Sequence, residues 1–359
     1  MLVNLFTAAK HPAGIILRIQ RIKSTSIHNC SKWDCFTTNF FEVNLLSKSI
    51  RIYIGIAVIH VSLIKNFLTN KNFLKKTISI VSFTISSILL LPGCAFKRVN
   101  RSKNIIYLQA DAGKQNAAQK LNVFAPYHND SLKDVLIFLY GGSWNSGRRG
   151  LYSFFGNRMA RKNVVTVIID YPKSPTAGYD EMATDAAIAV KWVKENILQY
   201  GGDPNKIFVS GHSAGGHLAT LITVRNSYFE KLGITNPIKG AVLIDAAGLD
   251  MYGYLKEEDF PEDNTYIKTF TNDPANWKLA SPLYNLHNGI APMLIYQGER
   301  TYPSIKAGNE NFLSALKNLG YTPSFHLLKG KKHVAMITQF FNSGNKRYKE
   351  IIEFMEKVK

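Results

Sequence analysis

Residues 208–222 read FVSGHSAGGHLATLI and combine the end of an apolar run, a glycine-rich turn and a helical pattern. The apolar run Ile207–Val209 predicts a strand, the motif Gly211-x-Ser213-x-Gly215 follows it, and small and apolar residues at helical spacing come next. The turn from strand to helix must be tight, because the two glycines leave almost no side chain on either side of the serine. A helix that starts here points its amides at negative charge that develops near Ser213. The pattern predicts that Ser213 is a nucleophile held at the end of a strand.

The chain around this stretch alternates between apolar runs and helical patterns. Strands are predicted at 135–139, 164–169, 207–209, 241–244, 293–296 and 324–328, and helices at 180–198, 306–319 and 334–357. Runs that are apolar throughout are typical of strands buried on both faces. We therefore expect an α/β fold, a mostly parallel sheet with helices on both faces, over residues 104–359. Functional side chains gather at the carboxyl ends of such strands.

Three motifs carry a resemblance to a known family. They are GGDPNKIFVSGHSAGGHLA at 201–219, YGGSW at 140–144 and WKLASPLYNL at 277–286. From about Leu121 to the C-terminus, the sequence resembles α/β-hydrolase esterases, especially small carboxylesterases and kynurenine-formamidase-like enzymes. The resemblance implies the α/β-hydrolase fold. One departure is Tyr140, which stands where these enzymes usually have a histidine.

The resemblance also implies where an oxyanion hole would form. The backbone amides of Gly142 and Ser143, in the YGGSW loop, and of Ala214, directly after the serine, would donate to the developing oxyanion. Such donors, fixed in a site shielded from water, are worth about 3–4 kcal/mol each in the transition state. Tyr140 changes the side chain before the loop but leaves the Gly-Gly backbone available.

A general base is expected after the last strand, because the chain order in this fold is serine, acid, histidine. His333, in the segment KGKKHVAMI, lies between the last predicted strand and the closing helix, and we assign it as the base. His326 lies inside the strand pattern and is interpreted as structural. His212 and His217 flank the serine motif and are interpreted as packing or pocket-lining residues.

The acidic partner of that histidine is less well defined. Many relatives place an aspartate three residues after the glycine that ends the penultimate strand, and here that residue is Thr301, which cannot be the anionic partner. Glu299, one residue after Gly298 on the same loop, is the favoured replacement. Asp245, at the end of the preceding strand, is the alternative, because a carboxylate there can also approach the histidine. A serine-histidine dyad without an acid stays open.

Residues 249–290 form an insertion rich in Tyr, Phe and acids, at the place where these folds carry a small cap over the pocket. A solvated loop with a short helix is the alternative interpretation. Taken together, the motifs predict a serine hydrolase that cleaves a small carboxylic ester through an acyl-enzyme on Ser213. Arylformamidase-like amide hydrolysis is a second hypothesis. A catalytically inert hydrolase-fold binding protein is a third, which Thr301 and Tyr140 favour.

The net charge of +19 is unevenly distributed over the 359 residues. Residues 1–103 carry 15 Lys and Arg against 2 acids, whereas residues 104–359 carry 29 against 23, a net charge of only +6. No basic run interleaved with aromatic residues follows residue 104, so nucleic-acid binding is not expected. The 3 cysteines all precede residue 95 and offer neither a disulfide framework nor a metal site, and no cofactor is expected.

Residues 71–94 have the pattern of an export signal. Lys71, Lys75 and Lys76 precede 15 uncharged residues, and Leu-Pro-Gly-Cys94 follows. The cysteine after the glycine resembles the lipobox of bacterial lipoproteins, which implies acylation at Cys94 and a lipid-anchored protein of the bacterial cell envelope that faces the periplasm. A single membrane-spanning helix is the alternative, although Pro92-Gly93 would interrupt it.

Residues 1–70 have no hydrolase-like pattern. This leader of doubtful status is basic and contains a short apolar run at 52–64. It is either a real extension, cytoplasmic or membrane-associated, or the result of a misplaced start, with the true start near Leu68 or Leu74. We favour the misplaced start.

Overall fold

The protein is described by a computed structural model over residues 98–110, 117–127 and 130–358. Contacts within the chain group Ala95–Lys359 as one compact unit, and the following description concerns this unit alone. The expected leader at 1–70 and the signal or anchor segment at 71–94, with Cys94, lie outside the described residues.

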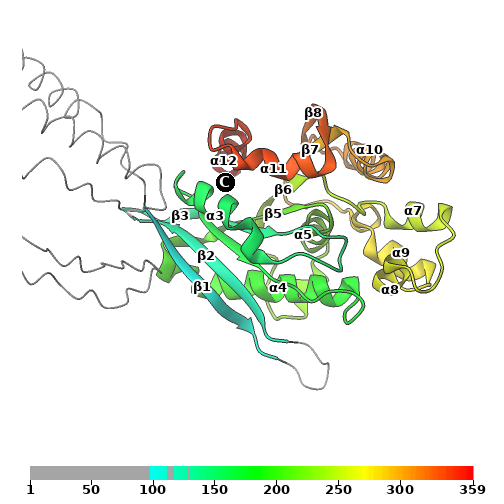
Figure 1. Ribbon diagram of the computed structural model, residues 1–359, viewed down its shortest axis with the longest axis horizontal. Coiled ribbons are helices and arrows are strands. Elements are labelled where there is room, and N and C mark those ends of the chain that lie inside the picture. Colours follow the sequence, from blue (N-terminus) through cyan, green and yellow to red (C-terminus); the bar gives the residue numbers. More distant parts are fainter. Residues whose placement is uncertain (1–97, 111–116, 128–129, 359) are drawn as a thin grey trace, which may run out of the picture. The chain divides into compact units, whose positions relative to one another are not determined.

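The centre of this unit is an eight-stranded sheet with the order β1-β2-β4-β3-β5-β6-β7-β8 (Figure 1). β1 and β2 pair antiparallel, β2 pairs antiparallel with β4, and all the other neighbours are parallel. The strands are β1 (Val99–Leu108), β2 (Gln119–Pro126), β3 (Lys133–Leu139), β4 (Val165–Ile169), β5 (Gly202–His212), β6 (Ile238–Ile244), β7 (Met293–Arg300) and β8 (Ser324–Lys332). The six predicted strands are all present.

β1 and β2 have no counterpart among the predicted strands. β1 lies at the edge of the sheet, and its first part, residues 99–104, is polar apart from Val99. β2 is buried, but Lys120 and Asn122 interrupt its apolar residues. Because β1 begins at Val99, the folded unit starts before residue 104, where the apolar pattern placed it.

Helices cover both faces of the sheet (Figure 1). Phe155 packs on Phe138 of β3 and Phe354 packs on Phe208 of β5, with ring centroids 4.8 Å and 6.3 Å apart. Phe138 neighbours Ser210, two residues after Phe208, so both contacts lie on one face of the sheet. The main helices of the sheet are α3 (Ser153–Ala160), α4 (Tyr179–Asn196), α5 (Ala214–Val224), α10 (Pro303–Asn318) and α12 (Arg347–Lys357). α4 and α5 pack against each other on the other face.

The single helix predicted over 334–357 is wrong. The segment instead forms α11 (His333–Thr338), the 3₁₀ turn η6 (Gln339–Phe341) and, after a break, α12. In the break, Asn342 Oδ1 accepts from Gly344 N at 2.9 Å and Asn345 Oδ1 accepts from Arg347 N at 2.9 Å. Asparagine side chains that bond nearby backbone groups compete with helical hydrogen bonds, which explains the break.

The predicted insertion between β6 and β7 is helical. It contains α7 (Met251–Glu257), α8 (Thr265–Phe270), α9 (Pro274–Ala280) and the 3₁₀ turn η5 (Pro282–Asn285). Asp250, Asn264 and Asp273 each cap the next helix by accepting from a backbone N–H two or three residues later. Three short helices therefore replace the alternative of a solvated loop. The remaining short elements are α6 (Ser227–Glu230), η3 (Arg149–Tyr152) and η4 (Ile197–Tyr200).

None of the helices within the described ranges combines the length and the apolar character that crossing a bilayer requires.

Candidate active site

Ser213 lies in a sharp turn between β5 and α5. Its φ of 54° and ψ of −123° are strained values for a residue with a side chain. The motif glycines allow the turn: a Cβ on Gly211 would lie 2.2 Å from the Gly215 carbonyl oxygen, and one on Gly215 would lie 2.2 Å from the Leu139 oxygen. Ser213 keeps 8% of its surface exposed. The fold therefore presents its side chain directly after the carboxyl end of β5.

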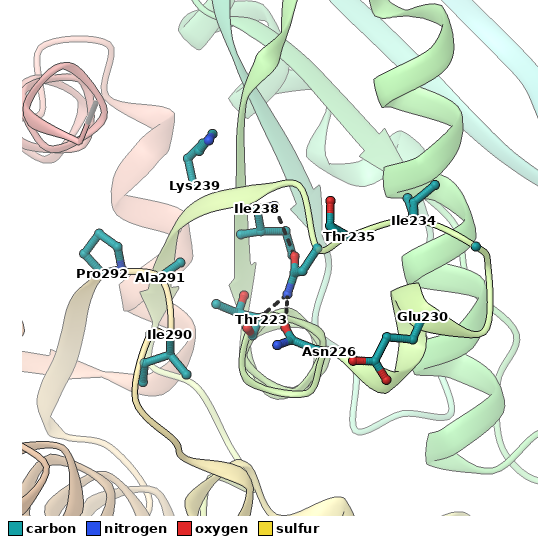
Figure 2. A pocket seen from close by; sticks show the side chains of 13 residues that line it. Thr223, Asn226, Glu230, Ile234, Thr235, Ile238, Lys239, Ile290, Ala291 and Pro292 are labelled. Atoms are coloured by element: carbon teal, nitrogen blue, oxygen red, sulfur yellow. Dashed lines mark hydrogen bonds between the residues drawn. The ribbon is translucent and has the colours of Figure 1, made fainter.

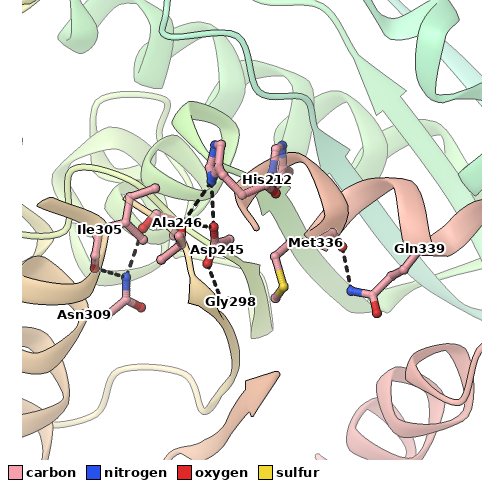
Figure 3. A network of polar contacts seen from close by, with 10 residues as sticks. His212, Asp245, Ala246, Gly298, Ile305, Asn309, Met336 and Gln339 are labelled. Atoms are coloured by element: carbon pink, nitrogen blue, oxygen red, sulfur yellow. Dashed lines mark hydrogen bonds and ion pairs between the residues drawn. The ribbon is translucent and has the colours of Figure 1, made fainter. Parts of the chain in front are cut away.

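Asp245 follows β6 and is fully buried. Its φ of 52° turns the chain at the strand end, where its N–H still donates to Tyr296 O at 2.7 Å. Oδ1 accepts from Gly298 N at 2.7 Å (Figure 3). Oδ2 accepts a short hydrogen bond from the Thr301 hydroxyl. Each of the two carboxylate oxygens of Asp245 therefore accepts a hydrogen bond from the end of β7 or the residue after it.

His333 begins α11, directly after β8. Its Nδ1 lies 2.6 Å from Asp245 Oδ2 and 3.4 Å from the Thr301 hydroxyl oxygen. Because a carboxylate accepts hydrogen bonds, Nδ1 carries the proton and Nε2 of the neutral ring keeps its lone pair. This is the tautomer that a general base requires.

Glu299 is not placed against His333. It is the penultimate residue of β7, and its Oε2 accepts from Gly330 N at 2.6 Å in the turn of β8. The Glu299 carboxylate thus contacts the backbone of β8. The contact with His333 that was expected of Glu299 is made by Asp245, the alternative.

The YGGSW loop lies beside the serine. Gly142 and Ser143 have φ of 141° and 49°, and a Cβ on Gly142 would lie 2.4 Å from the Ser146 carbonyl oxygen. Gly141 approaches so closely that an added Cβ would lie 3.0 Å from Ser213 Cβ. Ala214 is the first residue of α5, where a backbone N–H has no partner within the helix. The YGGSW loop and the start of α5 thus both lie beside Ser213.

Tyr140, the departure from the usual histidine, is fully buried before this loop. Its hydroxyl has no hydrogen-bond partner among the described residues, and burial raises its pKa. Its ring stacks on Tyr171 with centroids 4.7 Å apart, and the Tyr171 hydroxyl donates to Tyr140 O at 2.6 Å. Tyr140 therefore fixes the start of the loop by stacking and through its carbonyl.

His217 connects this loop to the insertion. The Trp144 Nε1–H donates to His217 Nδ1 at 3.2 Å, so the opposite ring nitrogen carries the proton and donates to Ala280 O at 2.7 Å. The ring is fully buried, and burial lowers its pKa to about 4. The packing role predicted for His217 is confirmed by these contacts.

Two contributions were missed from the sequence. The first is Thr301, whose hydroxyl donates to the Asp245 carboxylate. Its position three residues after Gly298 was the sequence feature that could have indicated this contact. The second is the contact of His212 with His333, which the place of His212 beside Ser213 did not indicate. Within the described ranges, no group of three or more His, Cys, Asp or Glu is arranged to hold a metal ion.

An open groove of about 770 Å³ lies far from this site (Figure 2). Thr223 and Asn226, which line it, lie at and just beyond the C-terminal end of α5, whereas Ser213 precedes the N-terminal end of that helix. Asn236 closes one side by donating to Thr223 O and to the Asn226 side chain, both at 3.2 Å. The groove therefore offers no route to the serine.

The model of the BD-FAE family matches residues 121–306. The chain belongs to the BD-FAE family. The matched range of this BD-FAE protein runs from β2 into α10 and includes Ser213, Asp245 and Thr301, but it ends before His333.

Curated relatives are esterases. Isoprenylcysteine alpha-carbonyl methylesterase ICME of Arabidopsis thaliana is 28% identical over 72% of this chain and 64% of its own length. Esterase LipQ of Mycobacterium tuberculosis is 31% identical over 52% of this chain and 46% of its own length. The BD-FAE chain thus spans less than two thirds of the length of these relatives.

Solved esterase structures show the same fold. A truncated carbohydrate esterase from gut microbiota has a TM-score of 0.62 at 18% identity, over 72% of this chain and 96% of that chain. The apo form of Thermogutta terrifontis esterase 2 has a TM-score of 0.59 at 22% identity, over 75% and 97%. Together with the strand order, these matches establish the α/β-hydrolase fold.

Proposed function

We propose that this BD-FAE protein hydrolyses small carboxylic esters, with Ser213 as nucleophile, His333 as general base and Asp245 as the acid behind it. The observation that carries the proposal is the 2.6 Å contact between Asp245 Oδ2 and His333 Nδ1. This contact joins the turn after β6 to the start of α11. Two segments far apart in the sequence thus supply the carboxylate and the imidazole of one pair. The esterase names of the curated relatives support the same class of reaction.

The first half of the reaction forms an acyl-enzyme. His333 Nε2 takes the proton of the Ser213 hydroxyl as Oγ attacks the ester carbonyl carbon. The carbonyl oxygen becomes an oxyanion, which accepts from the backbone amides of Gly142, Ser143 and Ala214. The imidazolium then gives its proton to the alcohol oxygen as the ester bond breaks.

The second half repeats these steps with water. His333 removes a proton from water, the hydroxide attacks the acyl carbon, and Ser213 Oγ leaves with the proton from the imidazolium. In both halves a positive charge forms on His333 next to the buried Asp245 carboxylate, at a contact of 2.6 Å. The Asp245 carboxylate therefore stabilises the charged transition state more than the neutral ground state. Such an interaction lowers the barrier of the reaction and does not merely strengthen substrate binding.

A fluorophosphonate probe tests the proposal. The wild-type protein should be labelled and Ser213→Ala should not, and the wild type alone should hydrolyse p-nitrophenyl esters of short acyl chains. N-formylkynurenine, assayed beside the esters, tests the arylformamidase hypothesis. A protein that neither reacts with the probe nor cleaves any ester would be an inert binding module, and the proposal would be wrong.

We also propose that the protein is anchored to a membrane by acyl chains on Cys94. The lysines before the uncharged run and the Leu-Pro-Gly-Cys94 sequence support it. The substrate would then meet the enzyme at the surface of a cell envelope.

A further inference from the structure

His212 is the last residue of β5 and stands directly before Ser213. Its ring stacks on the ring of His333, with centroids 4.7 Å apart and an angle of 29° between the planes. Its Nε2 lies 3.2 Å from the backbone carbonyl oxygen of His333. One side chain therefore contacts both the ring and the backbone of the base.

The contact with the carbonyl determines the tautomer of His212. A carbonyl oxygen only accepts, so Nε2 carries the proton and donates it to His333 O. Nδ1 then keeps its lone pair, and it is a buried atom without a hydrogen-bond partner among the described residues. A buried acceptor without a donor costs free energy that an apolar ring of the same shape would not cost. Compared with an apolar ring, the imidazole of His212 thus adds one favourable contact, the hydrogen bond to the His333 carbonyl.

The other side of the ring is closed by the oxyanion loop. A Cβ on Gly141 would lie 2.9 Å from His212 Nδ1 and 2.8 Å from His212 O. The imidazole of His212 is therefore wedged between the Gly141 backbone and the imidazole of His333. Since only 6% of its surface is exposed, it has little room to move.

The geometry points to His212 as a positioning residue, which holds His333 in line with Ser213 through the hydrogen bond from its Nε2 to the His333 carbonyl. This inference rests on the proposed function, because it assigns His212 a role only through the base. His333 begins α11 directly after Lys332, the exposed last residue of β8. Asp245 restrains the ring from one end, and His212 restrains the carbonyl and one face.

The charge of His212 is compatible with this role. Burial, followed by the neighbouring His333, lowers the pKa of His212 to about 4. Asp245, beyond His333, acts in the opposite direction, and the Gly141 backbone brings no charge. His212 is therefore neutral when His333 becomes an imidazolium, and no second positive charge opposes that step.

Two substitutions separate the hydrogen bond from the ring. His212→Phe keeps a flat ring and removes the donor, whereas His212→Gln keeps an N–H near the position of Nε2. With a p-nitrophenyl ester, we expect His212→Phe to lower kcat at least tenfold with KM changed less than twofold, and His212→Gln to recover most of that kcat. The downfield proton resonance of the His333 Nδ1–H bonded to Asp245 should broaden or shift in His212→Phe and return in His212→Gln.

His326→Phe is the matched control. His326 lies in β8 and stacks on Tyr296 with the same angle of 29°, at 5.3 Å, but has no contact with His333. The substitution should leave kcat and the downfield resonance unchanged.

The results distinguish this inference from the proposed function. If Ser213→Ala keeps its esterase activity, the proposed function fails. If Ser213→Ala is inactive but a folded His212→Phe keeps kcat and the downfield resonance, only the role of His212 fails. Should His212→Phe not fold, His212→Gln decides: a folded His212→Gln with kcat lowered a hundredfold overturns the inference, and one within fivefold of wild type supports it.

Discussion

At the scale of single residues, the carboxylate site is shared between two strand ends. Asp245 after β6 supplies the anion, while Gly298 and Thr301 around the end of β7 supply donors to its two oxygens. β6 and β7 are parallel neighbours, with Ile244 beside Tyr296, so their ends lie together. The Thr301 hydroxyl thus holds a carboxylate that comes from the end of the neighbouring strand.

Asp245→Asn should lower kcat by about 10³- to 10⁴-fold, because an amide neither balances the imidazolium charge nor selects the tautomer with Nδ1–H. KM and the free energy of unfolding should change much less, since the side chain is of the same size. Steady-state kinetics on a p-nitrophenyl ester and urea denaturation measure both quantities.

Glu299→Gln is the matched control for that substitution. The Glu299 carboxylate accepts only from Gly330 N within the described residues, so kcat should stay within a fewfold of wild type. If Glu299→Gln abolished activity and Asp245→Asn did not, the assignment of the acid would return to Glu299. If neither mattered while Ser213→Ala did, serine and histidine would work as a dyad.

The double variant Asp245→Asn with Thr301→Asp tests whether the acid can move between the two strand ends. Thr301 Oγ1 lies 3.4 Å from His333 Nδ1, so a carboxylate at 301 has access to the same nitrogen. We expect kcat to recover at least tenfold over Asp245→Asn alone. Thr301→Asn in the same background is the control, and an equal recovery there would show that charge is not the cause.

The turn at Ser213, the YGGSW loop and the place of His333 after the last strand could be predicted from the sequence, because each follows from a local motif or from chain order. It could not rank Asp245 above Glu299, because that choice depends on where the chain turns. The chain turns at Asp245, whose φ is 52°, and the Glu299 carboxylate accepts from Gly330 N. Neither feature leaves a pattern in the residues around it.

At the scale of elements, the turn between β5 and α5 depends on close backbone contacts. Gly215→Ala should lower the free energy of unfolding by about 3 kcal/mol or more, because its Cβ would meet Leu139 O at 2.2 Å and Tyr140 O at 2.4 Å. Both oxygens belong to the backbone of β3 and the residue after it, so no side chain can move aside.

Gly150→Ala is the control for that change. No atom lies within 4 Å of the position of its Cβ, so stability should change by less than about 1 kcal/mol. Urea denaturation of both variants gives the comparison. A Gly215→Ala protein as stable as Gly150→Ala would mean that the turn is looser than described.

The elements that the sequence predicted well are those buried on both faces. β3, for example, is a run whose residues Val135–Leu139 are fully buried, and its apolar pattern was sufficient. β1 was missed because an exposed edge strand is stabilised by backbone pairing with β2, which leaves little trace in side-chain type. The break before α12 was missed because it depends on side-chain bonds of Asn342 and Asn345.

At the scale of the whole molecule, we expect Cys94, and not the charge of residues 104–359, to attach the protein to a membrane. Residues 104–359 carry a net charge of only +6, which is too dilute for strong binding to a membrane surface. Cys94→Ser should therefore release the protein from the membrane fraction and lower its mass by that of the acyl chains. Intact-mass measurement and fractionation check this, and a mature protein that retains residues upstream of Cys94 would contradict it.

Stability of the folded unit should fall in acid because two histidines are buried as neutral rings. Burial lowers the pKa of both His212 and His217 to about 4, from a usual value of 6.5. The unfolded chain therefore binds more protons than the folded one between these values, so stability is complete above pH 6.5 and decreases as the pH falls toward 4. At about 1.4 kcal/mol for each pKa unit, either ring accounts for about 3 kcal/mol.

His217→Gln isolates one of these contributions, because a glutamine amide can still accept from Trp144 and donate to Ala280 but does not titrate. Urea denaturation of wild type and variant at pH 7 and at pH 4.5 gives the free energy of unfolding of each. Carboxylates that protonate in this range affect both proteins equally, so their effect cancels in the difference. The variant should lose about 2–3 kcal/mol less than the wild type. Parallel losses would mean that His217 takes up its proton in the folded protein, and its bond to the Trp144 N–H would then have to break.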